Sequence, residues 1–185
     1  MTVPRAALTA LLVFAATGAI AGTPPPEPAA YRTADYRAPV PATVNGRPAL
    51  TTDQAAAVWR QGSAVFIDTL PQPPRPPGLP EETIWHPMPR NDIPGSIWLP
   101  DTGYGELPAA MADYFERNLR EATGGDKDRQ LVFYCLAHCW MSWNAARRAA
   151  SLGYTQADWY AEGTDGWAMR NLPLERRDPV PRPNE

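Results

Sequence analysis

The chain has 185 residues, a formal net charge of −3 at pH 7 and a single lysine, Lys127. Because no cluster of basic residues could follow a phosphate backbone, the composition argues against a nucleic-acid partner. Proline is abundant, with 23 residues, most of which lie at 24–28, 71–89 and 173–183. Since proline restricts regular structure, the globular part of the chain is expected between and around these segments.

The first 21 residues have the form of a secretory signal. Arg5 gives a positive start, the apolar run "AALTALLVFAA" follows, and Ala19-Ile20-Ala21 fits a cleavage site with small flanking residues. The run is shorter than the ~20 apolar residues that a membrane-spanning helix needs. We therefore expect cleavage after Ala21, export to the periplasm, and no transmembrane anchor once the signal is removed.

An arm and a short helix are expected next. Residues 22–48 are rich in proline and are predicted to form an extended N-terminal arm. Thr51 is followed at the third position by Gln54, the spacing of a capping box. This spacing predicts a helix that runs to about Arg60 and ends at Gly62.

Apolar runs of strand length alternate with helical patterns over the rest of the chain. The predicted strands are "AVFID" at 64–68, the end of "IPGSIWLP" at 93–100, "LVFY" at 131–134, and "ADWYA" at 157–161. A helix is predicted from Pro108 to the "TGGDKDR" segment, and another from about Ser142 to Leu152. This alternation predicts an α/β fold with a mostly parallel central sheet flanked by helices.

A proline-rich insertion at about residues 70–90 interrupts this alternation. It follows the "VFID" strand, so it leaves the carboxyl edge of the predicted parallel sheet. Long loops inside compact domains are often lids or binding elements. Trp85 and His86 are therefore candidate substrate-binding residues, and a solvated insertion is the alternative.

Both cysteines, Cys135 and Cys139, lie in "FYCLAHCWMSWN", where a predicted strand leads into a helix. In parallel α/β folds such a loop lies at the edge where ligands bind, and a helix N-terminus favours the thiolate. A bridge across three residues constrains the unfolded chain little, so a reactive pair is favoured over a structural staple. Cys135 is the predicted nucleophile, Cys139 its partner, and His138 a candidate proton donor.

Four kinds of site compete for this loop. Haem attachment needs C-x-x-C-H and a thioredoxin-like dithiol needs C-x-x-C, and neither spacing matches. Soft thiolates suit Cu(I), so a copper or zinc site could combine the cysteines with His138 or His86, although two histidines make such a set sparse and no metal site is predicted. The fourth is a loop of the rhodanese type, in which backbone N–H groups surround the cysteine.

Segments far from the loop favour the fourth kind. "DIPGSIWLP" resembles the rhodanese segment that usually reads "HIPGAINIP", and "VFID" ends in Asp68 as an early rhodanese strand does. "LVFYC" resembles the strand before that family's catalytic cysteine, and "LGYTQADWYAEGTDGW" resembles its last segment. The resemblance implies a single rhodanese-like domain, predicted at 49–172, with a proline-rich C-terminal tail at 173–185.

A closer resemblance concerns "CW" after the paired cysteines, "MSWNAARRA" and "EGTDGW". These segments resemble the PQQ-dependent catabolism-associated CXXCW-motif proteins, although three residues separate the cysteines here. The resemblance implies sulfur transfer or thiol-redox work in the periplasm, with a PQQ-dependent dehydrogenase or a cytochrome c as partner. It implies no cofactor beyond a transient cysteine persulfide or a Cys135–Cys139 disulfide. A non-enzymatic copper or sulfur carrier, or an adaptor for such a dehydrogenase or cytochrome, stays open as the alternative.

Two features of the loop bear on the substrate. Trp140, directly after Cys139, is predicted to bind substrate or cover the thiols, and packing of the helix onto the sheet is the alternative. No arginine or lysine occurs from Cys135 through Asn144. Because thiosulfate is a dianion, it is expected to be a poor sulfur donor for this loop.

Overall fold

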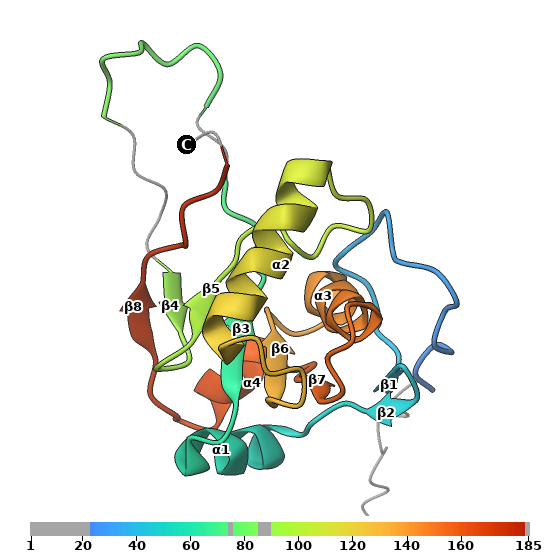
Figure 1. The fold of residues 1–185 in the computed structure, drawn as a ribbon. Helices are drawn as coiled ribbons and strands as arrows, with labels where there is room; N and C mark the ends of the chain where they lie inside the picture. The colour runs from blue at the N-terminus through green and yellow to red at the C-terminus, as the bar shows by residue number, and fades with distance from the viewer. Residues whose placement is uncertain (1–22, 74–75, 85–89, 184–185) are drawn as a thin grey trace, which may run out of the picture.

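A central sheet of four parallel strands forms the middle of the computed structural model, which describes residues 23–73, 76–84 and 90–183 (Figure 1). Its order is β5-β3-β6-β7. The strands are β3 (Val65–Asp68), β5 (Ile97–Trp98), β6 (Leu131–Tyr134) and β7 (Ala157–Trp159). The predicted α/β fold with a mostly parallel sheet is therefore confirmed.

Helices cover both faces of the sheet, because successive strand residues point to opposite sides. On β6, Leu131 and Phe133 belong to the larger apolar cluster, which includes residues of α2 (Ala109–Thr123) and α3 (Trp140–Ser151). Val132 and Tyr134 belong to a second cluster with residues of α1 (Thr52–Gln61) and α4 (Gly163–Met169). The near-continuous apolar sequence of β6 is what burial on both faces requires.

Local sequence patterns predicted the starts of the first two helices closely. The capping box at Thr51 and Gln54 is present, and α1 ends at Gly62 in the left-handed conformation, with φ 63°. Pro108 is the N-cap of α2, so the helix begins at Ala109, one position after the predicted first residue. α3 begins at Trp140, slightly before the predicted start near Ser142.

Two short antiparallel pairs lie outside the central sheet and were not expected. β1 (Thr43–Val44) and β2 (Arg47–Pro48) form a hairpin within the arm, joined by Asn45 and Gly46, both at positive φ. An Asn-Gly pair favours this tight turn. β4 (Arg90–Asp92) pairs with β8 (Glu175–Arg177) from the proline-rich C-terminal segment.

The N-terminal arm packs along α3. Asn144, which is fully buried, accepts a hydrogen bond from the Arg32 backbone N–H at 2.9 Å and returns one to the Arg32 carbonyl at 2.8 Å. The Arg148 guanidinium lies 4.8 Å from the centre of the Tyr31 ring. These contacts hold the arm against the helix that follows the cysteine loop.

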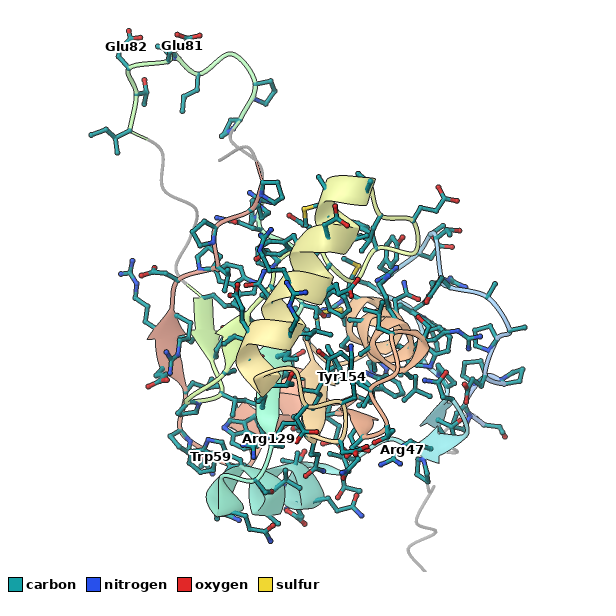
Figure 2. All side chains as sticks on the ribbon, viewed as in Figure 1. Arg47, Trp59, Glu81, Glu82, Arg129 and Tyr154 are labelled. Atoms are coloured by element: carbon teal, nitrogen blue, oxygen red, sulfur yellow. A yellow bond between two sulfur atoms is a disulfide. The ribbon has the colours of Figure 1, made fainter. Side chains whose placement is uncertain are left out.

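Within the insertion, residues 76–84 project away from the sheet, with Glu81 and Glu82 at the tip (Figure 2). Trp85 and His86 lie outside the described residues, as does the predicted signal at 1–21. Within the described ranges, no helix combines the length and the apolar character needed to cross a membrane.

Candidate functional site

The two cysteines flank the connection from β6 to α3. Cys135 directly follows β6, and Cys139 directly precedes the first residue of α3. The intervening backbone is not helical, and His138 lies at a φ of 54°, in the left-handed region. Since all four central strands are parallel, this connection lies at the carboxyl edge of the sheet, as predicted.

Cys135 and Cys139 are joined by a disulfide, with their Cα atoms 6.2 Å apart. The exposed fractions of the two residues are 0% and 2%. The predicted pairing of the cysteines is thus present. The sulfur atoms are withdrawn from the surface, so any substrate must reach them through a specific opening.

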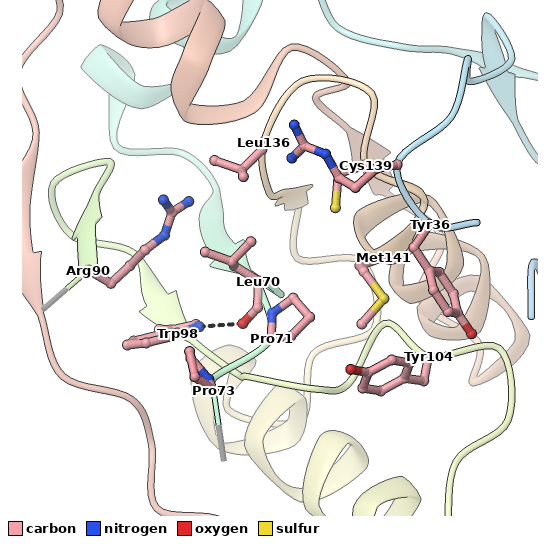
Figure 3. Close-up of a pocket in the computed structure, with 11 residues that line it drawn as sticks. Tyr36, Leu70, Pro71, Pro73, Arg90, Trp98, Tyr104, Leu136, Cys139 and Met141 are labelled. Carbon is pink, nitrogen blue, oxygen red and sulfur yellow. Dashed lines mark hydrogen bonds between the residues drawn. The ribbon is translucent and has the colours of Figure 1, made fainter. Parts of the chain in front are cut away.

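A cavity of about 540 Å³ provides that opening (Figure 3). Cys139 lines it, whereas Cys135 is not among its lining residues. The remaining lining residues are Leu70, Pro71, Pro73, Leu136 and Met141, the aromatic residues Tyr36, Trp98 and Tyr104, and two arginines, Arg37 and Arg90. The carboxyl edge of the sheet therefore presents one sulfur atom of the pair to a largely apolar chamber.

The arm closes one side of this site. The Tyr36 carbonyl accepts a hydrogen bond from the Trp140 N–H at 2.9 Å, and Arg37 pairs with Cys139 through an isolated antiparallel bridge. The sequence suggested that the N-terminus of α3 presents free N–H groups, but its first N–H is used by the arm. An anion approaching this helix end consequently finds one donor fewer than the sequence implied.

Arg90 supplies a cation that the loop sequence lacks. Its Nε donates a hydrogen bond to Asp68 Oδ2 at 2.8 Å and lies 3.1 Å from Asp92 Oδ1. Its Nη2 reaches the Cys135 carbonyl at 3.4 Å and Thr164 Oγ1 at 3.1 Å. The guanidinium therefore links Asp68 of β3 and Asp92 of β4 to the backbone of Cys135.

The loop is fixed from α4 as well. The Thr164 N–H donates to the Cys135 carbonyl at 3.0 Å, and the Ala137 N–H donates to Asp165 Oδ2 at 3.0 Å. Gly163, at a φ of 54°, lies so close to the Cys135 carbonyl that a Cβ atom there would clash with it. The "EGTDGW" segment thus serves as the support for the cysteine loop.

Asp92 is a buried acid next to this network. Burial and the neighbouring Asp68 together raise the pKa of Asp92 to about 9, because they outweigh the lowering by Arg90 and Arg177. Asp68 and Asp92 are both fully buried. At neutral pH Asp92 is therefore a neutral carboxyl group beside Asp68 and the Arg90 guanidinium.

This pKa predicts a specific pH dependence of stability. Between about pH 4 and pH 9 folded Asp92 keeps a proton that the unfolded chain releases, so stability should fall as pH rises through that window. One such proton contributes a slope of at most about 1.4 kcal/mol per pH unit. Asp92→Asn should flatten this slope, measured by urea unfolding at several pH values.

The matched control for that series is Asp113→Asn, at an exposed position of α2. It should keep the slope of the unmodified protein. An unchanged slope in Asp92→Asn would show that Asp92 is ionised in the folded protein.

The other predicted site residues lie in different surroundings. His138 is exposed at the outer side of the loop. Trp140 is buried in the larger apolar cluster, with its ring 5.2 Å from that of Trp143, and it does not line the cavity beside Cys139. Their predicted roles as proton donor and substrate contact stay predictions.

The sequence did not predict some of the residues that line the cavity. Arg90 stands two positions before Asp92 at the start of the "DIPG" segment, and Tyr36 and Arg37 belong to the arm. The available signal was Asp68, which ends the predicted "VFID" strand and has no arginine close behind it. A buried aspartate requires a partner from elsewhere in the chain.

Fold and loop together define a parallel α/β domain that presents a cysteine pair at its carboxyl edge. The family described as the rhodanese-like domain matches residues 56–170. The chain therefore belongs to the rhodanese-like domain family. Among the residues that the structure describes, no group of three or more His, Cys, Asp or Glu side chains is arranged to hold a metal ion.

Several solved structures are similar to this chain at low identity. The human single-domain sulfurtransferase TSTD1 is 23% identical, over 68% of this chain and 98% of its own, with a TM-score of 0.41. An uncharacterised protein from Saccharomyces cerevisiae is 21% identical, over 66% and 91%, with a TM-score of 0.41. A thiosulfate sulfurtransferase from Pseudomonas aeruginosa is 18% identical, over 71% and 21%, with a TM-score of 0.43. No curated protein matches the chain in sequence.

Proposed function

We propose that the protein transfers sulfur by thiol–disulfide chemistry at Cys135 and Cys139. The observation that carries this proposal is the bond between the two sulfur atoms, of which only the Cys139 sulfur belongs to a cavity-lining residue. An attacking thiolate must reach one particular sulfur, so access decides which cysteine exchanges with substrate. Cys139 is therefore the exchanging residue and Cys135 its internal partner.

In the first step, the Cys139 thiolate of the reduced protein attacks the outer sulfur of an organic persulfide. The sulfur–sulfur bond of the donor breaks, the organic thiolate leaves and takes up a proton, and Cys139 carries the persulfide. In the second step, the Cys135 thiolate attacks the Cys139 Sγ. The outer sulfur leaves as hydrosulfide and the disulfide forms, so that the dithiol loses two electrons and the transferred sulfur gains them.

The cycle closes when an external dithiol reduces the bridge. Its thiolate attacks the Cys139 sulfur from the cavity, and Cys135 leaves as a thiolate. Cys135 is the leaving sulfur because it is fully buried and lies outside the cavity lining, so the external thiolate attacks at Cys139.

The stoichiometry of sulfide release tests the proposal. Protein reduced and freed of reductant should release about one hydrosulfide per chain from an organic persulfide, and intact mass should then show the disulfide, as expected for a single two-electron pair. A second round should require added dithiol. Repeated release without dithiol, or release without return of the disulfide, would contradict the two-cysteine cycle.

We further propose that the protein is exported, and that it serves PQQ-dependent alcohol oxidation in the periplasm beside a quinoprotein dehydrogenase or a cytochrome c. Residues 1–21 and the "CW" and "EGTDGW" segments support this placement. The proposed mature chain then consists of the arm, the domain at 49–172 and the C-terminal tail. Cell fractionation with intact mass measurement tests it, since a chain that begins at Met1 in the cytoplasm would disprove export.

A further inference from the structure

We infer that the sulfur substrate of this site has an aromatic body and an anionic end, and that it is not a small inorganic anion. The inference rests on the proposed function in one respect, because it takes the Cys139 sulfur as the reacting atom. Its other support is the lining of the cavity in Figure 3, which is independent of the reaction.

Size is the first argument. The cavity of about 540 Å³ lies within the usual range of small-molecule sites. Thiosulfate would fill a small part of it and would leave apolar walls in contact with water. An aromatic ring would remove those walls from water, and burial of apolar surface is the main source of binding free energy in such sites.

The aromatic walls are held in place, which favours a flat partner. Trp98 Nε1 donates to the Leu70 carbonyl at 2.8 Å, and the Tyr36 hydroxyl accepts from the Gly105 N–H at 3.1 Å. The Tyr36 and Tyr104 rings meet edge to face, with centroids 5.4 Å apart. Because the polar atoms of Trp98 and Tyr36 are used within the protein, the parts of their side chains that line the cavity offer apolar contact to a ligand.

Met141 adds a second contact suited to a ring. Its side chain lies between Cys139 and Tyr104 in Figure 3, and the residue lines the cavity. A thioether sulfur makes favourable contacts with aromatic ring edges. A ring attached to the reacting sulfur by one carbon would therefore lie against Met141 while its sulfur meets Cys139.

Charge is the last argument, and it distinguishes the two arginines. Arg90 already contacts Asp68 and Asp92. Arg37 is exposed, and among the residues that the structure describes it has no ion-pair partner. Opposite residues of an antiparallel bridge project to the same side, so Arg37 and Cys139 share a side as well as the cavity. The anionic end of the substrate is assigned to Arg37.

A pair of disulfides measures this selectivity. The reduced protein is mixed with bis(4-carboxybenzyl) disulfide or bis(2-hydroxyethyl) disulfide, and each rate is divided by the rate with free dithiothreitol. The corrected rate should be at least about tenfold higher for the carboxybenzyl compound, a difference of about 1.4 kcal/mol in activation free energy. Arg37→Gln should lower this ratio severalfold, whereas Arg60→Gln, at an exposed position of α1, should leave it unchanged.

A binding measurement separates this inference from the proposed function. The oxidised protein is titrated with 4-(methylthiomethyl)benzoate, a thioether that cannot exchange, and binding should weaken in Arg37→Gln. Binding of the thioether without the sulfide stoichiometry described above would support the pocket assignment and remove the sulfur-transfer cycle. A ratio near one together with absent thioether binding, or stronger binding of thiosulfate than of the thioether, would overturn the assignment even if sulfide release occurs.

Discussion

Serine at position 139 is expected to abolish sulfide release from an organic persulfide, and the protein should then acquire no sulfur. Cys139 lines the cavity, whereas Cys135 is fully buried and lies outside the lining. A serine hydroxyl is far less nucleophilic than a thiolate, so the first step has no substitute. The measurement is hydrosulfide yield with intact mass on Cys139→Ser after exposure to the persulfide.

Cys135→Ser is the matched variant and should behave differently. The first step remains, so the protein should gain one sulfur atom on Cys139 and release hydrosulfide only when an external thiol is added. The sequence predicted the opposite order, with Cys135 as the first nucleophile. A persulfide on Cys135 in Cys139→Ser would restore that order and would require the buried cysteine to become accessible on reduction.

Alanine at position 163 is expected to cost about 2–5 kcal/mol of folding free energy, of which about 1–2 come from the left-handed conformation and the rest from overpacking. Gly163 has a φ of 54°, and a Cβ atom there would meet the Cys135 carbonyl group and the Leu136 backbone. The clash should also weaken the hydrogen bond from Thr164 to the Cys135 carbonyl. Urea unfolding measures the loss, and the alkylation rate of the reduced cysteines reports the loop.

Gly62→Ala isolates the conformational part of that cost. Gly62 ends α1 at a φ of 63°, and nothing lies within 4 Å of an added Cβ atom. Its variant should lose only about 1–2 kcal/mol and should leave cysteine alkylation unchanged. Equal losses in both variants would show that α4 moves away from the loop without cost, which would remove its supporting role.

Features with local causes were accessible from the sequence. The capping box at Thr51 depends on residues three apart, and β6 is recognisable because four consecutive apolar residues fit a strand buried on both faces. The strand-to-helix connection at Cys135 follows from the same local patterns. Parallel topology then places the loop at the carboxyl edge, so the position of the cysteines was predictable without coordinates.

The surroundings of the cysteines depended on contacts between distant residues. The sequence near Cys135 contains no cation, yet Arg90 reaches the Cys135 carbonyl across a separation of 45 residues. β4 and β8 are three residues each, too short for a periodic signal, and they pair across the whole domain. The packing of the arm on α3 was harder to predict, because its hydrogen bonds to that helix use backbone groups of the arm, which carry no side-chain pattern.

The hydrogen bond from the Trp140 N–H to the Tyr36 carbonyl affects which residues are needed when the domain is moved into another protein. The family match covers 56–170, so Tyr36 and Arg37 fall outside the segment that a domain exchange would normally move. A chimaera made from that segment would inherit both cysteines but would lack one wall of the chamber and the peptide strand beside Cys139. An engineered fusion that is to keep this chamber intact must therefore carry the stretch from Arg32 to Arg37 along with the domain.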